Sequence, residues 1–161
     1  MANLEAPIAQ STMTTTYRTA GVLYATSAVQ ARRIQLYEIE FGHYGALAST
    51  DINVQWDVSR FSSTAILTAT SVVPNLLDTA DASPLCLFFN NNTGELTYTT
   101  AGNGLSLKNW SVNQRGSYRW RALDDGDNIV IPATTIVGVG IRAQSGGYTQ
   151  SVVGNISFLE R

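Results

Sequence analysis

The chain contains a single histidine, His43, within the glycine-flanked segment 42–45. A Ser/His/Asp triad would have to use this imidazole as its general base. The sequence has no Gly-x-Ser-x-Gly segment, the sharp turn that presents a nucleophilic serine in many hydrolases. A lone histidine in a turn is typical of a solvated side chain, so we expect no catalytic role for His43.

Cys86 is the only cysteine and lies in the apolar run 85–89. A thiol in such a run usually fills the core and is chemically inert. One cysteine rules out an intramolecular disulfide, so the fold does not need an oxidising compartment. One cysteine and one histidine are also too few for a structural zinc site.

Acidic side chains gather in two places that we considered for chemistry. The turn 124–128, with sequence DDGDN, offers oxygen ligands but lacks the terminal bidentate glutamate of an EF-hand. Glu38 and Glu40 share one face of a predicted strand, where we expect them to pair with arginines of a neighbouring strand. The sequence therefore predicts a protein that is not an enzyme and that holds no cofactor and no metal ion.

Nine of the ten basic residues are arginine, which is enriched at protein interfaces where lysine is depleted. In strict alternation Arg119 and Arg121 point to one face of a strand, and Tyr118 and Trp120 point to the other. Two interpretations of the arginine face stay open. It meets an acidic neighbour, or its arginines pair within the sheet with Glu38, Glu40 or Asp57.

Residues 51–59 give the clearest strand signal in the chain. Their apolar side chains are Ile52, Val54, Trp56 and Val58, and their polar side chains are Asn53, Gln55, Asp57 and Ser59. A period of two over eight residues predicts a half-buried strand with one face in the core and one face in water. In residues 32–41 the apolar phase changes between Leu36 and Tyr37, which predicts a β-bulge or a change of sheet.

About eight strand signals follow one another with turns at the spacing of sandwiches and barrels, and no βαβ alternation interrupts them. We predict an all-β, jelly-roll-like antiparallel two-sheet sandwich over residues 17–161, preceded by an extended N-terminal arm over residues 1–16. The arm would be a disordered tail or would lie on a neighbour, and the long loop 60–84 would hold a short helical turn near 76–82. The predicted core contains Leu36, Ile52, Val54, Trp56, Val58, Tyr118, Trp120, Val139, Ile141, Ile156 and Phe158.

Only 14% of the 161 residues are charged, against roughly 25% in a typical soluble domain, and the formal net charge is −2. This balance gives no general attraction to nucleic acid. No apolar run is long enough to span a membrane, and the N-terminal residues lack the basic and apolar regions of a signal peptide. We therefore expect a protein that folds in a cytoplasm and has neither nucleic acid nor membrane as a partner.

Several segments, in their order along the chain, resemble small virion structural proteins of tailed bacteriophages. The segments are RIQLYE (33–38), VQWDVSRF (54–61), PNLLDTAD (74–81), NQRGSYRW (113–120), IVIPA (129–133) and GIR (140–142). The resemblance implies a jelly-roll decoration, or cement, protein on the capsid exterior, made in the cytoplasm of a bacterial host. Its partner would be the major capsid protein, and it would often form a homotrimer.

Under this hypothesis we expect contacts to the capsid or to another subunit in the arm, at surface arginines and in the acidic loop. The candidate residues are Met13, Thr14, Thr15, Thr16, Arg32, Arg33, Arg115, Arg119, Arg121, Asp78 and Asp81. The alternative is a carbohydrate- or receptor-binding module of a phage tail or fibre, whose tryptophans would stack on sugar rings. Apolar neighbours of Trp56, Trp110 and Trp120 favour core packing instead. A hydrolase of the same fold is the third hypothesis, disfavoured by the missing triad.

Overall fold

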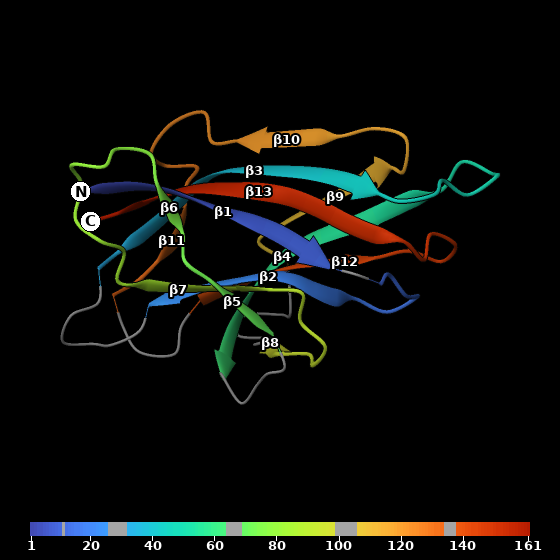
Figure 1. Ribbon diagram of the computed structural model, residues 1–161, viewed down its shortest axis with the longest axis horizontal. Helices are drawn as coiled ribbons and strands as arrows, with labels where there is room; N and C mark the ends of the chain where they lie inside the picture. The colour runs from blue at the N-terminus through green and yellow to red at the C-terminus, as the bar shows by residue number, and fades with distance from the viewer. Residues whose placement is uncertain (11, 26–31, 64–68, 99–105, 134–137) are drawn as a thin grey trace.

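The computed structural model describes residues 1–10, 12–25, 32–63, 69–98, 106–133 and 138–161. All regular elements among these residues are β-strands, and they form two antiparallel sheets packed against each other (Figure 1). The predicted all-β, two-sheet sandwich is therefore confirmed. Within the described parts of the chain, no helix is long and apolar enough to cross a membrane.

Each sheet is built from strands that are far apart in the sequence. Sheet A contains, in spatial order, β10 (Tyr118–Arg121), β3 (Ile34–Tyr44), β13 (Ser151–Glu160), β1 (Ala2–Gln10) and β6 (Asn75–Leu76), with β11 (Ile129–Ile131) also paired to β3. Sheet B contains β5 (Thr70–Val72), β7 (Cys86–Asn90), β2 (Arg18–Ala25), β12 (Gly138–Gln144), β4 (Asn53–Ser63) and β8 (Thr97–Tyr98), with β9 (Lys108–Asn113) also paired to β4. Strands β1 to β4 alternate between the sheets. This order favours the jelly roll, which stays a prediction.

The core between the sheets follows the predicted alternation of apolar side chains. Eight of the predicted core residues are completely buried, namely Leu36, Val54, Trp56, Val58, Val139, Ile141, Ile156 and Phe158. Ile52 and Trp120 are partly buried and pack against this core. Tyr118 was wrongly assigned to the core, because it is 42% exposed. Its strand, β10, lies at the edge of sheet A, so the ring contacts Phe41 but projects past it.

The phase change between Leu36 and Tyr37 is a β-bulge, as predicted. Along the pairing of β13 with β3, Ser157 lies opposite Glu38 and Phe158 lies opposite Leu36, so Tyr37 is the extra residue. A bulge shifts the side-chain phase by one position. Leu36 and Ile39 are both buried in the core as a result.

The N-terminal arm was the main error of the sequence prediction. Residues 2–10 are strand β1, which pairs antiparallel with all of β13 except Ser151, from Ala2 opposite Glu160 to Gln10 opposite Val152. Leu4 and Ile8 are buried in the core, and the sandwich therefore begins at Ala2 rather than at residue 17. The two termini consequently lie at the same end of the molecule (Figure 1). The short helical turn expected near 76–82 is absent, and this stretch contains β6 and turns.

Leu4→Ala tests the buried role of β1. Removing this buried side chain is expected to lower the free energy of unfolding by about 2–5 kcal/mol, since a cavity remains in the core. Glu5→Ala, at the next and outward-facing position, is the control and is expected to cost within about 1 kcal/mol. Urea unfolding followed by tryptophan fluorescence measures both. Equal, small effects would mean that residues 1–10 are a dispensable arm after all.

Candidate functional site

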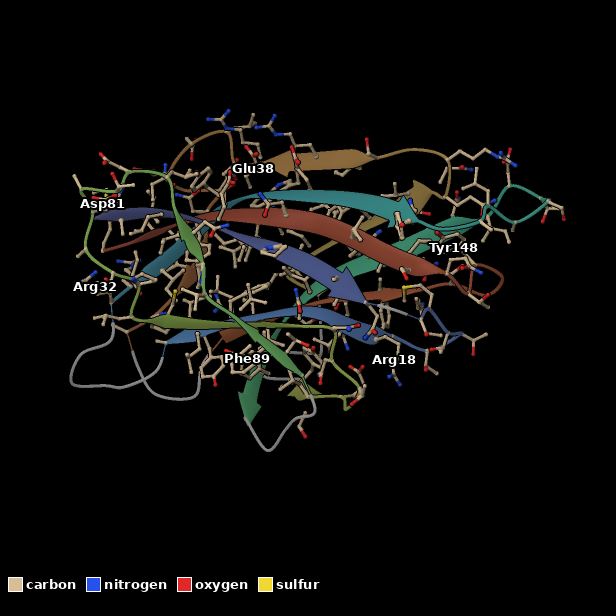
Figure 2. The ribbon with its side chains drawn as sticks, in the orientation of Figure 1. Arg18, Arg32, Glu38, Asp81, Phe89 and Tyr148 are labelled. Carbon is tan, nitrogen blue, oxygen red and sulfur yellow. The ribbon has the colours of Figure 1, made fainter. Side chains whose placement is uncertain are left out.

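The predicted contact residues are spread over three parts of the sandwich rather than gathered on one surface. Arg32 and Asp81 lie at the end that holds the termini, and Tyr148 marks the opposite end (Figure 2). Near Arg32 and Asp81 lie Arg33, whose backbone pairs with Arg161, and Asp78, whose carbonyl oxygen accepts a hydrogen bond from Asp81. Near Tyr148 lie Thr14, Thr15, Thr16 and Arg115. The Thr14 carbonyl oxygen accepts the Ser145 N–H, and Arg115 Nη2 donates to the Ala48 carbonyl oxygen. Arg119 and Arg121 lie on the outer face of sheet A.

Met13 was wrongly predicted as a contact residue. Its side chain is 1% exposed and belongs to the hydrophobic core. The carbonyl oxygen of the next residue, Thr14, accepts a hydrogen bond from the backbone N–H of Ser145 at 2.9 Å. The segment after β1 is therefore anchored by its methionine and by backbone pairing, and only Thr15 and Thr16 of the predicted contacts in it are exposed.

Arg119 and Arg121 pair with carboxylates of the neighbouring strand, which confirms the in-sheet interpretation. Arg119 Nη2 lies 2.6 Å from Glu38 Oε1, and Arg119 Nε lies 3.4 Å from Glu40 Oε1. Arg121 Nε lies 3.6 Å from Glu38 Oε2. The register of β10 on β3 puts Arg119 opposite Glu40 and Arg121 opposite Glu38, and Arg119 also reaches Glu38 diagonally. The outer face of sheet A is therefore a ladder of paired charges rather than a free basic patch.

The three tryptophans belong to the packing of the sandwich. Trp56 is completely buried, and Trp110 and Trp120 are partly buried against the core. The rings of Trp110 and Trp120 lie 6.0 Å apart between centroids, and Trp110 lies 5.0 Å from Phe41. The core-packing interpretation is confirmed for these three side chains.

An apolar surface occupies the end of the sandwich that holds the termini, and we call it the terminal-end surface. Its three large apolar side chains are Met1, Leu77 and Leu123, exposed at 70%, 51% and 93%. Asn3 holds two of the segments involved, because its carbonyl oxygen accepts the Leu77 N–H at 2.9 Å and its side-chain oxygen accepts the Tyr37 hydroxyl at 2.9 Å. The Tyr37 carbonyl oxygen in turn accepts the Ala122 N–H at 2.8 Å, next to Leu123.

Carboxylates surround the terminal-end surface, and several of them bind backbone N–H groups. Asp81 Oδ2 accepts the Asn3 N–H at 3.1 Å, and Asp78 Oδ1 accepts the Ala80 N–H at 2.9 Å. Asp124 Oδ1 accepts the Gly126 N–H at 2.7 Å, within the acidic turn considered for calcium. Among the described residues, no group of three or more His, Cys, Asp or Glu is arranged to hold a metal ion. The carboxylates therefore fix the loops that present the apolar side chains.

Cys86 is buried beside Glu160. Burial, with a smaller contribution from the Glu160 carboxylate, raises the pKa of the thiol far above its ordinary value. The Glu160 oxygens accept the Leu85 N–H at 3.0 and 3.1 Å and pair with Arg32 at 3.3 Å. A thiol held protonated in this way is a poor nucleophile.

His43 is half-buried rather than solvated, which corrects the sequence expectation. Its ring lies 5.5 Å from that of Tyr148 and 6.5 Å from that of Trp56. Nδ1 donates to the Gly116 carbonyl oxygen at 3.2 Å, while buried Nε2 has no hydrogen-bond partner among the described residues. Burial lowers the pKa of His43 below 6.5, and the bond to Gly116 opposes that shift only in part. The imidazole is thus a packed, neutral group at ordinary pH.

This lowered pKa predicts a pH dependence of stability. Protonation of His43 opposes folding, so its contribution is complete above pH 6.5 and is lost as the pH falls through the lower, folded-state pKa. His43→Asn keeps a donor for the Gly116 carbonyl but does not titrate. In urea unfolding between about pH 7.5 and pH 5, the wild type should lose more stability than this variant. Parallel pH profiles of the two proteins would contradict the prediction.

A buried ion pair lies on the outer side of sheet B, where the sequence predicted a wet strand face. Asp57 is 0% exposed, and its Oδ2 lies 2.5 Å from Arg142 Nη2 and 2.7 Å from Arg142 Nε. Ser59 Oγ donates to Asp57 Oδ2 at 2.7 Å, and Ser106 Oγ donates to Asp57 Oδ1. The carboxylate is therefore fully hydrogen-bonded, as a buried charge requires.

Two tyrosines cover this ion pair. The Arg142 guanidinium lies 4.8 Å from the centroid of the Tyr17 ring and 4.1 Å from that of Tyr98. Tyr98 lies over Gly140, where an added Cβ would collide with the tyrosine hydroxyl. The Tyr98 hydroxyl and Thr19 Oγ1 lie 2.5 Å apart, within hydrogen-bonding distance. The sequence does hold a signal for the site, since Arg142 is the only charged residue in strand β12.

Asp57→Ala tests the ion pair. It leaves the Arg142 guanidinium largely buried without its carboxylate, and the expected cost is about 3–5 kcal/mol in free energy of unfolding. Asp51→Ala is the matched control, since Asp51 pairs with Arg115 at 2.6 Å but both side chains are exposed. Its expected cost is below about 1 kcal/mol. Similar losses in the two variants, measured by urea unfolding, would show that burial does not distinguish the pairs.

Comparison of the chain with models of known protein families gave no match, and comparison with curated proteins gave no significant match either. The structure defines the class of the protein as an antiparallel β-sandwich. Its function is therefore inferred from its surfaces and from the resemblance of its sequence segments.

Proposed function

We propose that this protein is a structural component of a tailed-phage virion that binds the outer surface of the capsid shell and stabilises it. The observation that carries the proposal is the terminal-end surface, where Leu123 is 93% exposed at the same end of the sandwich as the exposed Met1 and Leu77. Grouped exposed apolar side chains with a polar rim are typical of protein interaction sites. The partner would be the major capsid protein, as the sequence resemblance implies.

The way in which the terminal-end surface is held supports a binding role. Hydrogen bonds through Asn3 and Tyr37 fix Leu77 and the segment before Leu123 to β1 and β3. A surface that is ordered before binding loses less conformational entropy when a partner docks. Affinity can then come from a few apolar anchors repeated over many copies, as in a protein that coats a shell.

The pairing of charges over the rest of the molecule also supports this role. Arg119, Arg121 and Arg142 face carboxylates of the same chain, so these arginines are not free to attract an anionic polymer. Contacts through apolar side chains depend little on ionic strength. We further propose a homotrimer on the shell, as the resemblance implies.

Leu123→Glu tests the proposed contact. A charge at the centre of an apolar contact is expected to weaken binding to the shell at least about tenfold, by about 1.4 kcal/mol or more. Leu47→Glu is the matched control, because Leu47 is 47% exposed on the loop after β3, away from the terminal-end surface. Co-sedimentation with capsids purified from phage that lack this protein measures both. Bare capsids should also release DNA at a lower temperature than decorated capsids.

Absence of the protein from purified particles would overturn the proposal. Loss of binding by Leu47→Glu together with full binding by Leu123→Glu would place the contact elsewhere and would refute the role of the terminal-end surface.

A further inference from the structure

The outer side of sheet B carries an open polar groove that the proposed capsid contact does not use. Gln144 of β12, Gln55 of β4 and Ser111 of β9 lie directly opposite one another in a row across three strands. Two hollows of about 210 and 340 Å³ lie along this row, and both are lined by Gln55 and Ser111. The two hollows are therefore adjacent, and we treat them together as one groove.

The residues that line this groove are mainly amides and hydroxyls, together with the aromatic residues Tyr17, Trp56 and Trp110. One hollow is lined by Tyr17, Trp56, Asn109 and Trp110 as well as Gln55 and Ser111. The other is lined by Thr15, Asn53, Gln144, Ser145 and Gly146 as well as the same two residues. Amide groups both donate and accept hydrogen bonds, as hydroxyls do. A ligand that carries many hydroxyl groups offers the same mixture of donors and acceptors.

The groove is electrically neutral, because no charged residue is among those that line the two hollows. Asp57 and Arg142, two positions further along the same two strands, neutralise each other at 2.5 Å. A phosphate or sulfate group would find no free cation among these lining residues. The lining therefore favours a neutral ligand.

The polar side chains of the groove are ordered before a ligand arrives. Gln144 Nε2 donates to Gln55 Oε1 at 2.6 Å, which leaves the Gln55 NH₂ group and the Gln144 carbonyl oxygen to face a ligand. The Tyr17 ring is held against the Arg142 guanidinium at 4.8 Å. A fixed aromatic ring gives an apolar surface to the C–H face of a pyranose, while the amides bind its hydroxyls.

The groove lacks the large exposed apolar side chains that a protein interface would offer. The large apolar side chains that are exposed among the described residues are Met1, Tyr44, Leu47, Val73, Leu77, Tyr118, Leu123 and Val153, and the groove contains none of them. The core of a protein interface is largely apolar. From its shape, neutrality and amide lining we propose that this groove binds a neutral oligosaccharide.

Binding is tested with the full-length protein and a panel of neutral hexasaccharides built from glucose, galactose, mannose or N-acetylglucosamine. Saturation-transfer NMR and calorimetry should detect at least one of them with a Kd of about 1 mM or tighter. Tyr17→Ala and Gln55→Ala should each weaken that binding about tenfold. Asn155→Ala, which removes an amide from the outer face of sheet A, should leave it unchanged, and thermal unfolding checks that every variant is folded.

Failure of all four hexasaccharides to bind at about 10 mM would overturn the inference. Equal loss of binding in Asn155→Ala would also overturn it, because the groove would then not be the site. If Tyr17→Ala and Gln55→Ala instead abolish binding to the capsid, the groove is a protein interface. A protein that coats capsids but binds no sugar refutes only this inference, whereas one that binds sugar but no capsid refutes only the proposed function.

Discussion

Pairing of the first strand with the last, β1 with β13, is the interaction on which sheet A depends. It runs from Ala2 opposite Glu160 to Gln10 opposite Val152, and the other edge of β13 pairs with β3. Asn3, which anchors the terminal-end surface, takes its position from this register. The strand that was expected to be a free arm therefore closes the core and also positions the most exposed apolar side chains of that end.

Large alternating side chains explain what could be predicted from the sequence. In β4, Val54, Trp56 and Val58 recur with a period of two, and in β3 the one-residue phase change marks the bulge at Tyr37. Strand β1 gives a weaker signal, because its buried positions include two alanines and its centre holds Pro7. The bulge could be predicted because large side chains mark the pattern on both sides of Tyr37. Strand β1 could not, because small side chains occupy part of its buried face, although both strands belong to sheet A.

The candidate sites were harder to predict than the fold, because burial on an outer face comes from segments distant in the sequence. Asp57 lies at a position of β4 that periodicity assigns to water, yet Tyr17 and Tyr98 flank its partner Arg142. The ion pairs of Arg119 and Arg121 could be predicted, because that required only the side-chain alternation along two strands that pair with each other. When a side chain from another segment covers a strand, the alternation of polar and apolar residues in that strand does not change, so its sequence does not indicate the burial.

The two proposed surfaces fit one orientation of the molecule. The groove extends to Ser145 and Gly146, which begin the loop of Tyr148, at the end opposite Arg32 and Asp81 (Figure 2). If the terminal-end surface docks on a shell, this part of the groove points away from the shell. Between the two ends the β-strands supply continuous hydrogen-bonded backbone, so a load on one end need not deform the other. A rigid sandwich can therefore bind the capsid shell at one end and present neutral side chains that bind hydroxyl groups at the other.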